Sequence, residues 1–311
     1  MQCPRLDHFV RFNYNGTVSR CGHMINAPQF QTLEDMEKSD WLSNVKLQLK
    51  PKECARCFET ELANGTSIRI NAIKFHQQQN IPNYLSVGGV LDNVCNSACF
   101  TCDENHSTRI GSLTSKIFPI VDNSNNFWKL PLHRIVHLDI NGGEPSASKN
   151  YKNLLKNLPS NIKSIRVNTN GSIFLDEVID IINKGIKVTV TVSLDGINEV
   201  HDFVRWPIKW KKFYHNLLRY KSIPNLDLNT WTTISALNIG DFENIEKFVA
   251  DNGLNHSYAF LHYPDPINVK YKNKMTEQFN YLFPNLVATD KNNQEELDSW
   301  LIKQKHVRDL E

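Results

Sequence analysis

Three cysteines in the middle of the chain have the spacing of a metal-binding loop. Cys95, Cys99 and Cys102 form a C-x3-C-x2-C pattern directly after a strand-like run over 84–91. Cysteine thiolates are the usual ligands of iron–sulfur clusters, so three of them can hold three irons of a [4Fe–4S] cluster and leave the fourth iron open to a substrate. A structural zinc site would need a fourth ligand, for which His106 is the nearby candidate. Three unrelated buried cysteines are the remaining alternative.

The other four cysteines fall in the first fifth of the chain and could form a second site. Cys3 and Cys21 flank a segment that alternates like two strands around the Asn-Gly pair at 15–16. That pair is a strong hairpin signal, and a hairpin would bring the two cysteines together. Cys54 and Cys57 add a C-x-x-C pair. Four thiolates in two pairs make a closed tetrahedral site, for which composition alone favours zinc over iron–sulfur.

The elements that must position these cysteines alternate between strand and helix from residue 83 onward. Such alternation predicts a parallel α/β sheet or barrel, in which ligands bind at the carboxyl ends of the strands. We expect six strands with helices between them, fewer than the eight units of a complete barrel. The strands are expected over 84–91, 135–140, 163–168, 186–193, 226–233 and 256–261, and the helices near 106–117, 148–158, 174–184, 209–221 and 240–251.

The segments outside this alternation are expected to be simpler. A helix should begin at a Thr32 cap and continue through 41–47, because threonine caps helix N-termini well. Residues 71–82 read as a polar connector, and a further helical stretch is expected near 293–304. We therefore predict a cysteine-rich domain over 1–80, a barrel-like core over 81–265 and a C-terminal extension over 266–311 that packs on the barrel.

Polar and glycine residues follow the expected second and third strands. Gly142 and Gly143 precede Glu144, and paired glycines let the backbone approach a ligand so that exposed carbonyls and amides can clasp an ammonium group. An ordinary strand-to-helix turn is the alternative. On the third strand, Asn168 is the last residue expected to point into the barrel mouth, whereas Asn170 is expected to serve the turn.

Candidates at the later strand ends are less specific. Ser193 ends the fourth strand, and Asp195, His201, Asp202 and Arg205 follow it. The purely structural interpretation is that the two aspartates cap the next helix and that His201 is a packed, hydrogen-bonded histidine. Further along the chain, Asn238 could contact substrate or cofactor, or it could stabilise a turn. His262 and Tyr263 are weaker candidates for contacts with a substrate.

Together these motifs resemble the radical S-adenosylmethionine enzymes. The resemblance rests on the three-cysteine loop, the Gly-Gly-Glu-Pro segment at 142–145 and the Ser-Leu-Asp-Gly block at 193–196 with its His-Asp and arginine. It implies a partial (β/α)6 TIM-like barrel and a [4Fe–4S] cluster whose open iron binds the amino and carboxylate groups of S-adenosylmethionine. It also implies cofactor contacts: Gly142, Gly143 and Glu144 at the amino group, Asn168 near the ribose, Ser193 near the ribose or carboxylate, and Arg205 at the carboxylate.

The N-terminal cysteines resemble the SPASM/twitch auxiliary-cluster module of the same enzymes. The pattern is C-x12-G-x4-C followed by C-x-x-C. This resemblance favours a second [4Fe–4S] cluster at Cys3, Cys21, Cys54 and Cys57 over zinc. In most such enzymes the module follows the barrel, whereas here it precedes it, as in a subgroup of twitch-type proteins.

The resemblance implies the following activity. A low-potential donor of flavodoxin or ferredoxin type would reduce the cluster, S-adenosylmethionine would be cleaved to a 5′-deoxyadenosyl radical, and the radical would abstract hydrogen from a substrate. An oxidative modification of a peptide or peptide-like substrate is the leading expectation. The same chemistry on a sugar, nucleoside or amino acid is the alternative. A zinc or iron–sulfur binding protein on a degenerate barrel, or an iron–sulfur electron carrier, would be a different class of function.

Composition excludes several other classes. The chain has 35 basic and 33 acidic residues in 311, so bulk charge predicts no attraction to nucleic acid or membrane. It has no Gly-x-Gly-x-x-Gly or Walker loop, no apolar run of about 20 residues and no apolar leader at its start. We expect a soluble cytoplasmic protein. In a reducing cytoplasm, seven cysteines favour metal ligation over disulfides.

Overall fold

The computed structural model describes residues 2–114, 118, 120–261, 263–271, 273–284, 286 and 291–309, with the side chains of residues 63 and 64 left out. One sheet organises these residues. Its strands are β1 (Phe9–Phe12), β2 (Val18–Ser19), β3 (Leu85–Val90), β4 (Ile135–Asn141), β5 (Ser164–Thr169), β6 (Lys187–Ser193), β7 (Asp227–Ile234) and β8 (Asn255–Phe260).

The sheet is open and almost entirely parallel. Its strand order is β2-β1-β3-β4-β5-β6-β7-β8, and only the β1–β2 hairpin is antiparallel. All six predicted strands are confirmed, each to within one residue at either end. The α/β class and the partial, unclosed barrel are therefore confirmed as well.

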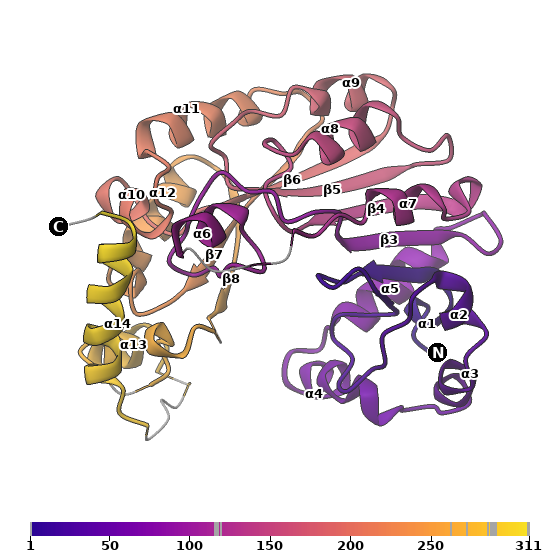
Figure 1. The fold of residues 1–311 in the computed structure, drawn as a ribbon, viewed down its shortest axis with the longest axis horizontal. Coiled ribbons are helices and arrows are strands. Elements are labelled where there is room, and N and C mark those ends of the chain that lie inside the picture. The colour runs from indigo at the N-terminus through magenta and orange to yellow at the C-terminus, as the bar shows by residue number, and fades with distance from the viewer. Residues whose placement is uncertain are drawn as a thin grey trace.

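Each strand after the hairpin is followed by at least one helix. The helices of this part are α6 (Thr108–Thr114), α7 (Ser124–Trp128), α8 (Lys149–Lys156), α9 (Glu177–Asn183), α10 (Glu199–Val204), α11 (Trp210–Lys221) and α12 (Phe242–Asp251). Figure 1 shows the sheet as an arch, with α8, α9 and α11 along its outer side. The predicted helix near 106–117 begins at Thr108, and residues 115–117 lie outside the described residues.

Alternation along the strands explains the two faces of this arch. In β6, the side chains of Val188, Val190 and Val192 are buried, and those between them are less so. Successive side chains of a strand point to opposite faces, so the valines pack under the helices in the main hydrophobic core. The intervening positions of β4 and β5, such as Asp139 and Arg166, are left to line the inner side.

The N-terminal region adds its hairpin to the same sheet. Gly16, at the predicted turn, has φ +81°, and β1 pairs in parallel with β3. The first 80 residues thus share a sheet with the core. The predicted domain boundaries at 80 and 265 stay predictions.

Two local predictions in this region were wrong. The single helix expected from Thr32 is two short helices, α2 (Leu33–Glu37) and α3 (Asp40–Lys46), because Ser39 caps a second start by accepting from the Leu42 N–H. The connector expected over 71–82 is mostly helical, since Ser67 caps α5 (Ile68–Gln77) and accepts from the Ile70 N–H. The remaining helices of the region are α1 (Arg5–His8) and α4 (Ala55–Asn64).

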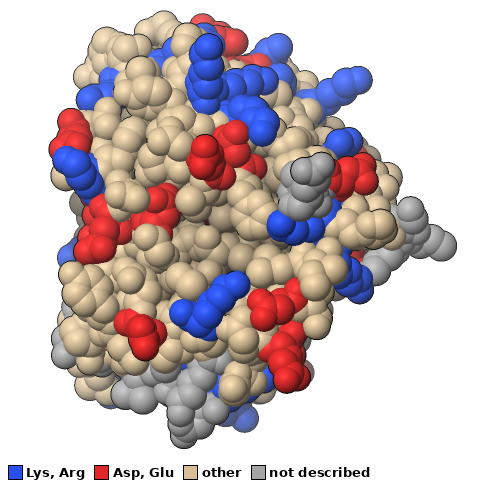
Figure 2. Space-filling model, turned by 90° about the vertical axis from the view of Figure 1, so that its left-hand side faces the viewer, with Lys and Arg blue, Asp and Glu red and all other residues tan. Residues whose placement is uncertain are grey.

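The C-terminal extension forms α13 (Thr276–Leu282) and α14 (Gln294–Val307), so the helix predicted near 293–304 is confirmed. Figure 1 places both helices at the β8 end of the arch, away from the N-terminal region. On this face, Figure 2 shows basic and acidic residues interspersed, as expected for a chain with balanced charge. In the part of the chain that the structure describes, no helix is long and apolar enough to cross a membrane.

Candidate functional site

The three-cysteine loop follows β3 and is held in place by main-chain hydrogen bonds. The Ala98 N–H donates to the Trp206 carbonyl at 2.7 Å, and the Phe100 N–H donates to the Val204 carbonyl at 2.9 Å. The Cys95 N–H donates to Thr108 Oγ1 at 3.2 Å. The loop is therefore fixed between the start of α6 and the end of α10.

The three cysteines of this loop share one buried environment. Ser97 Oγ lies 3.3 Å from Cys95 Sγ and 3.5 Å from Cys99 Sγ. Burial, followed by the neighbouring Cys99, raises the pKa of Cys95. Burial also raises the pKa of Cys102 well above its ordinary value, with further contributions from Cys99 and Cys95. Three buried thiolates this close to one another need cations between them, and this donor set fits a [4Fe–4S] cluster with an open iron.

His106, the candidate fourth ligand for zinc, has other partners. Its Nδ1 lies 2.5 Å from Asp103 Oδ1, and its ring packs edge-on against Tyr14 with centroids 4.1 Å apart. Within the described ranges, no three His, Cys, Asp or Glu side chains are grouped so that they could hold a single metal ion.

The glycine turn after β4 packs directly against the cysteine loop. Gly142 and Gly143 have φ +84° and +55°, values that other residues rarely adopt. A Cβ on Gly143 would lie 2.6 Å from the Val94 carbonyl oxygen, and the Glu144 N–H donates to that same oxygen at 2.7 Å. The two glycines therefore let the turn and the loop approach each other, and the turn is placed where the sequence predicted a cofactor contact.

The Glu144 carboxylate is occupied by the protein itself. The residue is 1% exposed and accepts hydrogen bonds from the Ser146 N–H at 3.0 Å, Thr169 Oγ1 at 2.7 Å and the Asn170 N–H at 2.6 Å. This carboxylate ties the end of β4 to the end of β5. The cofactor contact predicted for Glu144 stays a prediction.

The two asparagines at the end of β5 have separate contacts. Asn168 is half-buried at the strand end and donates to the side chain of Asn141. Asn170 makes the expected turn, accepting from the Ser172 N–H at 2.9 Å. Its amide also donates to Asn96 Oδ1 at 2.9 Å, so it links β5 to the cysteine loop as well. The Asn-Gly pair at 170–171 indicates only a turn, so this second contact was not predicted from the sequence.

Arg205 lies close to the cysteine loop and is anchored by Asp195. The two side chains are 2.8 Å apart, and Asp195 also accepts from the Thr233 N–H at 2.8 Å. Although burial opposes it, the negative charge of Cys99 and Asp195 raises the pKa of Arg205. Arg205 Nε is buried without a hydrogen-bond partner among the described residues. Ser193 is half-buried at the end of β6, the same edge of the sheet.

Asp195, Asp202 and His201, which neighbour Arg205, differ in their contacts. Asp195 does not cap a helix, whereas Asp202 accepts from the Trp210 N–H at the start of α11, as a cap does. His201 is packed as expected, with its ring 4.2 Å from that of Phe213, but the predicted hydrogen bond was wrong. Neither of its ring nitrogens has a partner among the described residues, and burial lowers its pKa to about 3.

The later candidates, Asn238 and Tyr263, differ in their surroundings. Asn238 accepts from the Ser235 N–H and donates to the Asp195 and Thr233 carbonyls, which is a turn role. Tyr263 is 65% exposed, and His262 lies outside the described residues.

Arg308, just after α14, contacts the cysteine loop and was missed by the sequence analysis. Its guanidinium donates to the Ala98 carbonyl at 2.8 Å and to the Cys99 carbonyl at 3.4 Å, and it lies 4.3 Å from the Phe100 ring centroid. Burial lowers its pKa to about 10, although Cys99 and Cys102 oppose that shift. No local pattern marks this arginine, because its partners are 210 positions away in the sequence.

The four N-terminal cysteines come together as predicted. Cys3, Cys21, Cys54 and Cys57 line one small cavity. Burial raises the pKa of Cys3 to about 11, and burial with the other three sulfurs raises the pKa of Cys54 to about 12. Four thiols around one cavity fit a [4Fe–4S] cluster with every iron ligated, whereas among the described residues no such group is spaced for a single zinc ion.

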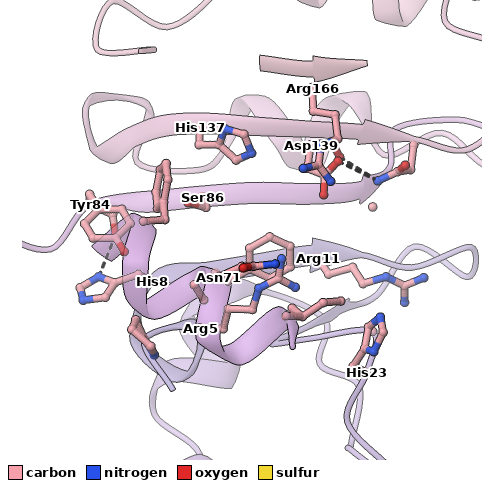
Figure 3. A pocket seen from close by; sticks show the side chains of 18 of the residues that line it. Arg5, His8, Arg11, His23, Asn71, Tyr84, Ser86, His137, Asp139 and Arg166 are labelled. Carbon is pink, nitrogen blue, oxygen red and sulfur yellow. Dashed lines mark hydrogen bonds between the residues drawn. The ribbon is translucent and has the colours of Figure 1, made fainter. Parts of the chain in front are cut away.

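A larger cavity of about 480 Å³ lies between the two cysteine sites. Its lining includes Arg5 and His23, which also line the N-terminal cysteine cavity, and Tyr14, which packs against the cysteine loop through His106. Figure 3 shows its inner strands carrying His137, Asp139 and Arg166 above the N-terminal segment. A cavity of this size is typical of a small-ligand site.

Comparison with known proteins gives one significant sequence relative. No family model matches the chain. A 185-residue segment is 24% identical to the sporulation killing factor maturation protein SkfB of Bacillus subtilis (strain 168), covering 57% of this chain and 43% of SkfB. The chain spans less than half the length of this curated relative.

Two solved structures with bound S-adenosylmethionine are also similar to this chain. Streptococcus suis SuiB bound to S-adenosylmethionine matches with a TM-score of 0.47 and 12% identity, over 81% of this chain and 57% of that one. Native anSMEcpe with bound AdoMet matches with a TM-score of 0.45 and 15% identity, over 65% of this chain and 63% of that one. The twitch-like nature of the N-terminal module stays a prediction.

Proposed function

We propose that this chain is a radical S-adenosylmethionine enzyme that modifies a peptide. The observation that carries the proposal is the junction of the cysteine loop with the glycine turn, where the Glu144 N–H donates to the Val94 carbonyl at 2.7 Å. Three buried thiols, a turn of exposed main chain and an anchored arginine meet at one strand-end edge. When bound at Cys95, Cys99 and Cys102, a [4Fe–4S] cluster would supply the electron that cleaves S-adenosylmethionine to the hydrogen-abstracting 5′-deoxyadenosyl radical.

The chain's own residues would bind and orient the cofactor. Main-chain groups of Gly142 and Gly143 would receive its amino group. Arg205 would receive its carboxylate, because Asp195 already fixes the guanidinium while Nε keeps an unused, buried N–H. Asn168 and Ser193, half-buried at the ends of β5 and β6, would contact the ribose.

Two further features would serve the reaction. Phe100 is fully buried beside the loop, under Trp300 and Arg308, so water is kept from that side of the sulfurs. The cavity between the two cysteine sites would hold the substrate near the cofactor. We assign a second [4Fe–4S] cluster to Cys3, Cys21, Cys54 and Cys57, with zinc as the alternative.

A peptide substrate is supported by the similarity to SkfB, which is named as the maturation protein of the sporulation killing factor. A small molecule such as a sugar, nucleoside or amino acid is the alternative within the same chemistry. In either case, a low-potential donor of flavodoxin or ferredoxin type would reduce the enzyme.

The test is an anaerobic reconstitution with iron and sulfide, followed by reduction, addition of S-adenosylmethionine and measurement of 5′-deoxyadenosine. About eight irons per chain with 5′-deoxyadenosine formed would support two [4Fe–4S] clusters and the enzyme. About four irons plus one zinc with the same product would keep the enzyme and make the N-terminal site structural. A fully loaded protein that forms no more product than its Cys99→Ala variant would contradict the proposal and favour a binding role.

A further inference from the structure

The cavity between the two cysteine sites has an excess of positive charge. Among the lining residues, the charged side chains are Arg5, Arg11 and Arg166 against a single carboxylate, Asp139. The whole chain is nearly neutral, with 35 basic and 33 acidic residues, so this local excess is a property of the cavity.

The histidines of the cavity add no charge near neutral pH. Burial, reinforced by Arg166 and Arg5 and opposed by Asp139, lowers the pKa of His137 to about 4. Burial and the nearby arginines also lower the pKa of His23, and burial lowers the pKa of His8. Burial is the largest cause of the lowered pKa of all three rings, so near neutral pH the excess charge belongs to the guanidinium groups.

One of the three arginines has a role in the N-terminal cysteine site. Arg5 Nη1 donates to Cys21 Sγ at 3.6 Å, and its guanidinium lies 4.1 Å from the Phe9 ring centroid. We therefore assign Arg5 to compensation of the thiolates. Arg11 and Arg166 are left to balance Asp139.

Neither of these two arginines is neutralised by the protein. Arg11 donates to the uncharged Asn13 side chain at 2.7 Å. Arg166 on β5 is the register partner of Asp139 on β4, yet among the described residues neither arginine has a carboxylate within 4.0 Å. Asp139 instead accepts from Asn141 Nδ2 at 3.2 Å. Figure 3 shows Arg166 coming from the sheet above and Arg11 from the segment below.

We propose that this cavity binds a carboxylate of the substrate between Arg166 and Arg11, while Asp139 accepts a hydrogen bond from the same substrate. Guanidinium groups pair with carboxylates through two parallel hydrogen bonds, so arginine side chains are well suited to orient a carboxylate. Two arginines against one aspartate leave one positive charge, which matches one carboxylate. A phosphate dianion would place a second negative charge near Asp139 and is disfavoured.

This inference rests on the proposed function for its chemistry but names a substrate class. The carboxylate belongs to an aspartate or glutamate of the peptide or to a small carboxylic acid. Asp139 is two residues before Asn141, where β4 ends and the glycine turn begins. A substrate held at Arg166 would therefore present the atoms beyond its carboxylate to the predicted cofactor edge.

Direct binding to the metal-loaded protein tests this inference. The probes are blocked tetrapeptides in pairs that differ only as Glu against Gln or Asp against Asn, together with glutarate and inorganic phosphate, measured by isothermal titration calorimetry. At least one acidic peptide or glutarate should bind about 10- to 100-fold more tightly than its amide counterpart, as expected for a charge-assisted pair. Preference for the acidic peptides or for glutarate identifies the source of the carboxylate.

Variants of opposite sign separate the charge effect from a folding defect. Arg166→Gln and Arg11→Gln should abolish the acid preference, whereas Asp139→Asn should increase it several-fold by removing the like charge. Arg219→Gln, an exposed arginine on α11, should leave it unchanged. Circular dichroism and metal content of each variant report its folding.

Several results would overturn the inference. One is equal binding of the acid and amide members of each peptide pair, and another is an acid preference that survives in both Arg166→Gln and Arg11→Gln. A third is tighter binding of phosphate than of any carboxylate, and a fourth is no binding of any acid at about 10 mM. Because binding is measured apart from 5′-deoxyadenosine, an acid preference in an inactive protein would reject the proposed enzyme and keep this site. An active protein without the preference would do the reverse.

Discussion

The two cysteine sites differ in how the chain builds them. The loop site takes all three sulfurs from one short segment, and distant residues such as Asn170, Arg205 and Arg308 surround it with polar contacts. The N-terminal site takes its sulfurs from three separate segments, and apolar residues such as Leu6 and Met24 complete its lining. The first arrangement would leave one iron of the proposed cluster open and fixes charges around it. The second would close on its proposed metal and tie three segments together.

The largest effect should come from breaking the loop site. Cys99→Ala removes a buried ligand, so we expect 5′-deoxyadenosine to fall to background, a loss of at least about 1,000-fold. Iron should fall by about half, because the N-terminal cysteines do not depend on this loop. Iron analysis and product measurement on the same sample check both. Loss of all iron would show that the two sites are not independent.

Breaking the N-terminal site should cost stability rather than cofactor cleavage. In Cys54→Ala, the metal that joins the hairpin to α4 is lost, and the free energy of unfolding should fall by several kcal/mol. The loop site should still cleave S-adenosylmethionine without substrate turnover. Urea denaturation and the uncoupled reaction measure the two effects. A stable variant that has lost all cleavage would contradict this division of roles.

Glu144→Gln tests whether the hydrogen bonds that hold the glycine turn beside the loop site are needed for binding of S-adenosylmethionine. A carboxylate can only accept hydrogen bonds. A glutamine would direct its N–H groups at the N–H groups of Ser146 or Asn170 and leave these donors unpaired, which costs about 1–3 kcal/mol of free energy. Affinity for S-adenosylmethionine should fall about 10-fold with iron content unchanged. Glu246→Gln, at an exposed position of α12, is the matched control and should have no effect.

Arg308→Gln tests the contact that only the loop site receives from the C-terminal extension. Removing the guanidinium leaves the Ala98 and Cys99 carbonyls without a charged donor, a loss of about 1.5–3 kcal/mol. Iron should be released to a chelator about 10-fold faster from the loop site, and at an unchanged rate from the N-terminal site. Lys303→Gln, exposed on α14, provides the control. Equal acceleration at both sites would indicate a general loss of structure.

The smallest effect concerns His201, which lies one helical turn before Arg205. Its folded-state pKa of about 3 is below the unfolded value of about 6.5. Its contribution to stability is therefore complete above pH 6.5 and is lost as pH falls toward 3. Between pH 7.5 and 5.5 this group should lower the free energy of unfolding by about 1.4 kcal/mol. His201→Phe keeps a ring against Phe213 but has no group that titrates. Between pH 7.5 and 5.5 its free energy of unfolding should therefore fall by about 1.4 kcal/mol less than that of the unchanged protein. Urea denaturation at the two pH values measures the difference, and identical pH dependence in both proteins would contradict it.

Local signals in the sequence were enough for the sheet and for the sulfurs. The strands follow from alternating apolar residues such as Val188 and Val190, and the hairpin from one Asn-Gly pair, because neighbours in sequence fix both. The helix α5 was missed because its residues are polar and its start depends on a single cap, Ser67.

The parts of the site that could not be predicted depend on long-range contacts. The motif around Glu144 indicated its position, but the hydrogen bonds that occupy its carboxylate come from Thr169 and Asn170 on another strand. Arg308 carries no pattern of its own, because only the folded chain brings it to the loop. Spacing predicts ligands within one segment, whereas the groups that neutralise and orient them are set by packing.

The contact between Arg308 and the cysteine loop sets an order of events during synthesis. Arg308 follows Ala98 by 210 positions, which at about 5–20 residues per second means about 10–40 s of translation. Throughout that interval the loop carries its cysteines without their charged partner. Assembly of iron at this loop is therefore favoured on the finished chain, while the four N-terminal cysteines have all left the ribosome long before.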